Sequence, residues 1–111
     1  MIPLVCFVGP SGVGKTTLLE KIVNLIEGMA DIILVEGYRD SCNAEIAVFR
    51  SAVCAEPPVE SDRLLAVVTD EKLPLESLQF GFAQVDSIID FIIKHIKSRE
   101  HGSQPIQSVV S

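Results

Sequence analysis

Apolar residues along the chain gather in short blocks, and the spacing inside each block predicts its secondary structure. Residues 2–8 form an apolar run that ends at Gly9, and residues 31–36 (DIILVE) and 64–69 (LLAVVT) form two more. Runs of this length are typical of buried strands. Residues 45–50 (EIAVFR) alternate polar and apolar side chains and predict a further strand, which gives a sheet of about four strands.

Two stretches instead show the 3.6-residue period of helices that cover a sheet. In residues 15–27 the apolar positions are Leu18, Leu19, Ile22, Val23, Leu25 and Ile26, and Gly28 supplies a stop. In the second helix they are Val85, Ile88, Ile89, Ile92, Ile93 and Ile96.

The first strand, first helix and second strand make a βαβ unit. We expect the two strands to be parallel, with a right-handed crossover and their carboxyl ends at one edge of the sheet. Residues 37–44 are too few for a crossover helix. We therefore expect strand 45–50 to pair as a hairpin or at an edge, and its direction stays open.

Composition limits the class of protein. The 111 residues fit one domain over 1–100 and a flexible tail over 101–111. No apolar run is long enough to span a bilayer, and the first residues lack a signal peptide, so we expect a cytoplasmic protein without a membrane partner. The net charge of −6 argues against nucleic-acid binding, and Cys6, Cys42 and Cys54 lack the spacing of a zinc or disulfide framework.

Residues 9–16 (GPSGVGKT) match the phosphate-binding P-loop (Walker A) pattern GxxxxGK[ST]. The match follows a predicted strand and opens a predicted helix, which is the context that this motif requires. Glycines allow backbone N–H groups to converge on a phosphate, and the helix N-terminus adds partial positive charge. Lys15 is expected at the β- and γ-phosphates, and the Thr16 hydroxyl at Mg²⁺. The predicted nucleotide-binding residues of this segment are Gly9, Ser11, Gly12, Val13, Gly14, Lys15, Thr16 and Thr17, the last with helix packing as its alternative role.

Two carboxylates follow predicted strands. Glu36 closes the second strand beside the P-loop and is expected to hold Mg²⁺ or its water shell, against the alternative of a plain charge at a strand end. Asp70 follows strand 64–69 and could accept hydrogen bonds from guanine N1 and N2, although a turn-initiating Asp explains it equally well. Arg39 and Arg50 are candidate phosphate or partner contacts, or simply solvated side chains.

The segments GPSGVGKTTLLEKIV, DIILVEGYRD, EIAVFR and LLAVVTD, in that order, resemble the MobB family, the GTP-binding adaptor proteins of molybdopterin-guanine dinucleotide biosynthesis. The resemblance covers roughly residues 1–100, and the VEGY segment is its most specific part. It implies a P-loop NTPase-like α/β fold with a mostly parallel sheet and flanking helices, binding of GTP and Mg²⁺, and slow GTP hydrolysis at most. It also implies homodimerisation and association with the guanylyltransferase that attaches GMP to molybdopterin. Family members carry a longer insertion between the first helix and the VEG strand, so this chain is a minimal or shortened version.

Two other functions stay open. A small P-loop kinase or ATPase normally needs an acceptor pocket and an arginine-bearing lid, for which this chain has little room. A structural protein whose P-loop binds nothing is the other. Finally, so few helices could leave part of the sheet uncovered, which favours a dimer or partner surface, with ordinary burial in the core as an equal alternative. The residues concerned are Ile46, Val48, Phe49, Phe80 and Phe82.

Overall fold

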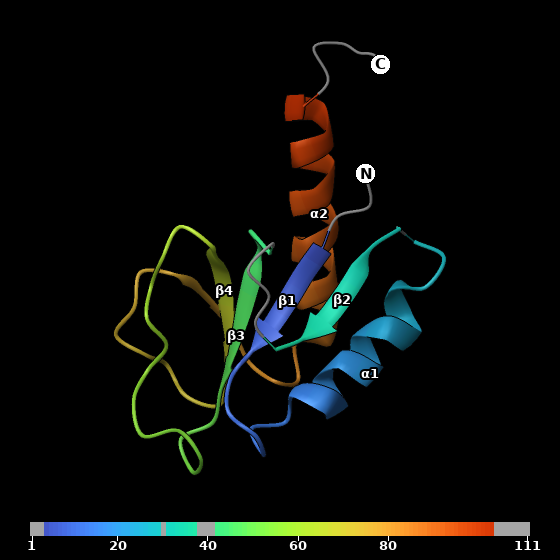
Figure 1. Cartoon of the computed structure of the whole chain (residues 1–111). Coiled ribbons are helices and arrows are strands. Elements are labelled where there is room, and N and C mark those ends of the chain that lie inside the picture. Colours follow the sequence, from blue (N-terminus) through green and yellow to red (C-terminus); the bar gives the residue numbers. More distant parts are fainter. Residues whose placement is uncertain (1–3, 30, 38–41, 104–111) are drawn as a thin grey trace.

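The computed structural model describes residues 4–29, 31–37 and 42–103 of the chain (Figure 1). Strands and helices alternate at first and then give way to consecutive strands. In chain order the elements are β1 (Leu4–Val8), α1 (Lys15–Ile26), β2 (Ile33–Glu36), β3 (Glu45–Phe49), β4 (Leu64–Thr69), β5 (Leu78–Phe80) and α2 (Val85–Ser103).

The strands form one five-stranded sheet in the order β2-β1-β3-β4-β5, and every neighbouring pair is parallel. The parallel pairing of β1 with β2 confirms the predicted βαβ unit. All five carboxyl ends therefore lie at one edge of the sheet, the lower edge in Figure 1. The order reverses between β1 and β3, and crevices for ligands open at such switch points, outside the carboxyl ends of the strands.

Both helices pack on the same face of the sheet. Leu18 and Ile22 of α1 and Ile88 and Ile92 of α2 belong to one buried cluster with Phe7 of β1, and all five side chains are at most 2% exposed. The apolar residues predicted from the period of each helix thus form the stripe that packs on the sheet. Figure 1 shows α2 passing behind the sheet.

Loops cover the opposite face. A second buried cluster there contains Cys6, Val8, Ala47, Phe49 and Val67 from β1, β3 and β4. Cys42, before β3, and Leu73, after β4, pack against these strands from outside, and Cys54 contacts both clusters. The carboxyl edge of the sheet is therefore flanked by helices on one side and by coil on the other.

The expected hairpin or edge pairing of strand 45–50 is wrong. β3 lies in the interior of the sheet, parallel to both β1 and β4, and all five of its residues are buried. The alternation of polar and apolar residues expected for EIAVFR is also incomplete, because only its two ends are polar. The edge pairing was inferred from the short connection, but β2 has only four residues, so the eight residues 37–44 are enough to span its length. Tyr38, Arg39 and the rest of residues 38–41 lie outside the described residues.

The expected number of strands also needs correction. The three-residue strand β5 was not predicted, since LQF between polar residues carries no detectable period. Of the two alternatives for the apolar side chains of the sheet, core burial holds: Ile46, Val48 and Phe49 are buried, and Phe80 and Phe82 are half-buried. The ring centroids of Phe80 and Phe91 lie 5.7 Å apart.

Helix α2 continues to Ser103, past the expected start of the tail, and residues 104–111 of that tail lie outside the described residues. Within the described ranges, no helix combines the length and the apolar character that crossing a membrane requires.

Candidate functional site

Residues 9–14, which we call the glycine loop, connect β1 to α1 at the carboxyl edge of the sheet. Gly9, Gly12 and Gly14 have φ angles of 152°, 82° and 100°, a region that residues with a side chain rarely adopt. At Gly9 a Cβ atom would also stand 2.7 Å from the carbonyl oxygen of Val48 on β3. The glycines that the motif requires are therefore required by this backbone as well.

The N-terminus of α1 opens directly from this loop. Gly14 is the N-cap, no side chain caps the helix, and no acidic residue stands in its first turn. The first N–H groups of a helix lack partners within it and carry partial positive charge. Nothing in this first turn neutralises that charge, so the loop and helix start together can bind an anion.

Lys15 folds back over the glycine loop. Its Nζ donates hydrogen bonds to the carbonyl oxygens of Gly9 and Pro10, the second at 3.4 Å. The ammonium group therefore stands at the mouth of the loop, where a bound phosphate group would gain an ion pair.

Thr16 and Glu36 meet beside the loop. The Thr16 hydroxyl donates to Glu36 Oε1 at 2.6 Å, and both residues are exposed. Thr16 comes from the first turn of α1, and Glu36 from the end of β2, where its register partner is Phe7 of β1. A hydroxyl and a carboxylate are the hard oxygen ligands that Mg²⁺ takes when waters and phosphates fill its other positions. The two predicted metal ligands thus fit that ion, although among the described residues no group of three His, Cys, Asp or Glu could hold a metal alone.

The remaining residues of the motif divide between core and solvent. The Val13 side chain is fully buried in the cluster beneath the helices, so it fixes the loop to the core and leaves only its backbone for a ligand. Ser11 and Thr17 are exposed on the loop and on the first turn of α1. Both are therefore accessible to a ligand.

Asp70 lies at the same edge but two strands away from β1, in the order β1-β3-β4. Its two carboxylate oxygens accept from the Ser51 backbone N–H at 3.0 and 3.2 Å, and Oδ2 also accepts from the Ser51 hydroxyl at 2.9 Å. The Ser51 backbone hydrogen bond is the main reason that the pKa of Asp70 is lowered. Asp70 thus joins the ends of β3 and β4, and it also lines a cavity of about 570 Å³ between the ends of β4 and β5.

Sequence reasoning missed how Arg50 acts. Its Nε donates to the Val13 carbonyl at 3.3 Å, and its guanidinium lies 4.0 Å from the centre of the Phe82 ring. A Cβ on Gly14 would be 3.2 Å from Arg50 Nη2. Arg50 therefore supports the glycine loop against the segment that follows β5. No sequence signal marks Phe82 or Ser51, because their partners are distant along the chain; the other candidate, Arg39, lies outside the described residues.

Within the described chain, the structure therefore brings together the glycine loop, Lys15, Thr16 and Glu36, and it places Asp70 along the same edge. Comparison of the chain with protein-family models and with curated proteins found no match.

Proposed function

We propose that the chain binds GTP with Mg²⁺ through the glycine loop, in a P-loop NTPase-like fold. The observation that carries this proposal is the 2.6 Å contact between Thr16 and Glu36. The motif predicts the first as a metal ligand, and the second was predicted from its place at a strand end. The two residues predicted as metal ligands therefore meet beside an anion-binding loop.

Guanine as the base is supported by a cavity at the carboxyl edge and by the family resemblance. The cavity at the ends of β4 and β5 lies on the carboxyl edge, and Asp70 and Lys72 line it. Three hydrogen bonds from Ser51 leave part of the acceptor capacity of the Asp70 carboxylate for a base. The preference for GTP otherwise rests on the resemblance of the VEGY and VVTD segments to the MobB family.

On the same resemblance, we propose that the chain is an adaptor in molybdenum cofactor biosynthesis, with slow GTP hydrolysis at most. Its partners are a second copy of the chain and the guanylyltransferase that attaches GMP to molybdopterin. Members of the MobB family carry an insertion between the first helix and the VEG strand. In this chain β2 instead follows α1 after the short segment 27–32 and forms an edge of the sheet. The glycine loop and the oxygens of Thr16 and Glu36 that would bind the metal are present despite this short connection.

Calorimetric titration tests the proposal, with Mg²⁺-GTP and Mg²⁺-ATP added to the chain and to Lys15→Ala. We expect GTP to bind more tightly than ATP, and Lys15→Ala to weaken GTP binding roughly 10- to 100-fold, because charged hydrogen bonds contribute about 1.5–3 kcal/mol. A control variant, Lys94→Ala, removes an exposed lysine that pairs with Asp90 on α2 and leaves binding unchanged.

Other outcomes identify the alternatives. Equal or tighter binding of ATP contradicts the guanine and molybdenum-cofactor parts and favours a small kinase or ATPase. No binding by a folded chain contradicts nucleotide binding altogether and favours a structural role.

A further inference from the structure

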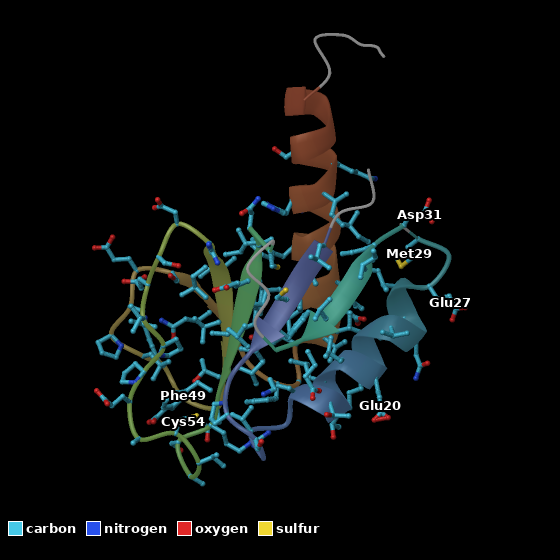
Figure 2. All side chains as sticks on the ribbon, viewed as in Figure 1. Glu20, Glu27, Met29, Asp31, Phe49 and Cys54 are labelled. Atoms are coloured by element: carbon cyan, nitrogen blue, oxygen red, sulfur yellow. The ribbon has the colours of Figure 1, made fainter. Side chains whose placement is uncertain are left out.

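A second cavity, of about 470 Å³, lies on the face of the sheet that the helices leave to loops. Its floor follows β3, where Glu45, Ala47 and Phe49 share one face because side chains alternate along a strand. The segment between β3 and β4 covers it, and Figure 2 shows Phe49 and Cys54 together at the lower end. The lining residues of that segment are Val53, Cys54, Ala55, Glu56, Pro58, Val59 and Ser61.

Glu45 is the unusual member of this lining. It is only 8% exposed, yet within the described part of the chain its carboxylate makes no hydrogen bond or ion pair. Only its backbone is engaged, through the N–H that donates to the Arg63 carbonyl at 2.8 Å. The carboxylate oxygens are nevertheless not fully buried, so a charged ligand in the cavity can reach them. Sheltered charges in proteins are normally paired.

The rest of the cavity selects for a positive partner. Among the described residues that line the cavity, the side chains other than those of Glu45, Glu56 and Ser61 are apolar, and none of them is Lys or Arg. The chain as a whole carries a net charge of −6. A ligand that leaves water here gains an ion pair in an environment of low dielectric at one end and apolar contact along the rest.

We propose that this cavity binds a small organic cation, with an amidinium or ammonium group at Glu45 and an apolar body over Ala47 and Phe49. The cavity touches the glycine loop only at Gly9 and Pro10. The metal oxygens of Thr16 and Glu36 do not line it, and β2, which carries Glu36, lies on the other side of β1. This site therefore does not depend on nucleotide binding.

The test uses benzamidine as the probe and neutral benzamide, which has nearly the same shape, as its control. Both are titrated into the full chain without nucleotide, and binding is followed by backbone amide NMR shifts. We expect benzamidine to shift the amides of Ala47, Phe49, Val59 and Leu64 and to bind at least 10-fold more tightly than benzamide.

Two variants locate the site. Glu45→Gln removes the charge at constant size, and we expect it to weaken benzamidine binding at least 10-fold without lowering the melting temperature, since no ion pair is lost. Ala47→Leu keeps the charge but fills the floor, and we expect it to abolish binding. Glu27→Gln, on the far side of the molecule in Figure 2, is the matched control and leaves binding unchanged.

Three results overturn the proposal: no shift at millimolar benzamidine in folded wild type, equal binding by wild type and Glu45→Gln, or shifts confined to residues outside the cavity. Nucleotide binding is measured separately, so failure here leaves the proposal for the glycine loop standing, and the reverse also holds.

Discussion

At the scale of single residues, the backbone of the glycine loop requires glycine, because the loop cannot accommodate a Cβ atom at some positions. Gly9 combines a φ of 152° with a carbonyl oxygen, from Val48, that would be 2.7 Å from any Cβ. Gly28 also has a positive φ, of 84°, but nothing lies within 4 Å of its Cβ position. Substitutions at these two glycines therefore distinguish the cost of backbone strain from the cost of a steric clash.

We expect Gly9→Ala to lower the free energy of unfolding by about 3 kcal/mol, because strain and overpacking each cost about 1–3 kcal/mol. Gly28→Ala, which adds strain alone, lowers it by about 1 kcal/mol. Urea denaturation of the two variants measures the difference. Equal losses would mean that Val48 gives way and that the close approach is unimportant.

Thr16 and Thr17 are adjacent and exposed, but only Thr16 contacts Glu36. We expect Mg²⁺ to increase the affinity of the chain for GTP. If Thr16 holds Mg²⁺, Thr16→Val reduces this gain in affinity at least 10-fold, which corresponds to about 1.4 kcal/mol. Thr17→Val leaves that gain unchanged, whatever it does to affinity itself. Titrations with Mg²⁺ and with EDTA measure the gain, and an unaltered gain in Thr16→Val would remove Thr16 from the metal site.

At the scale of elements, Asp70 and Ser51 connect the ends of β3 and β4. These hydrogen bonds lower the pKa of Asp70 in the folded chain. They therefore stabilise the folded chain at pH values above 3.8, the ordinary pKa of this carboxyl group. The stabilisation is lost as the pH falls through the lowered pKa. We expect Asp70→Asn to be less stable than wild type at pH 6, and we expect this difference to shrink as the pH falls below 3.8.

Denaturation curves between pH 6 and pH 2.5 check this expectation, with Asp62→Asn as the control. Asp62 is exposed, and none of its side-chain atoms makes a hydrogen bond with the described residues. A constant difference between Asp70→Asn and wild type over this range would show that the carboxylate charge contributes nothing.

The elements differ in how far sequence predicts them. β1, α1, β2 and β4 match their predicted ranges within about two residues at the described positions, because each strand is a continuous apolar run and the helix has a regular period. β5 was missed, since three residues carry too little pattern. The interior position of β3 was missed because it depends on β1 and β4, which lie far away along the chain.

At the scale of the whole molecule, nucleotide binding and stability are linked. A ligand that binds only the folded chain stabilises it by about 2.7 kcal/mol at 100 times its Kd. For a domain of this size we expect Mg²⁺-GTP to raise the melting temperature by roughly 10 °C. Scanning calorimetry of wild type and Lys15→Ala checks this, and a similar rise in both would place the nucleotide elsewhere.

Homodimerisation stays a prediction. The residues of the sheet no longer support it, but another group of exposed apolar side chains does. The residues expected to lack cover are buried or half-buried, whereas Leu25, Met29 and Ile33 are about half exposed around the turn from α1 to β2. Figure 2 shows Met29 beside Glu27 and Asp31 at this turn. Light scattering distinguishes a 12.1 kDa monomer from a dimer.

The sequence by itself determined what is local in this protein: the glycine loop, the helix that opens from it, the apolar stripes, and carboxylates at strand ends. These follow from periods and motifs within a few residues, where backbone geometry leaves few choices. Only the tertiary structure decided that the Thr16 hydroxyl donates directly to Glu36, that Asp70 is held by Ser51, that Arg50 stacks on Phe82, and that Glu45 faces a cavity without a partner among the described residues. Each of these depends on which strands become neighbours, and strand order is fixed by packing the whole sheet, which no single segment encodes.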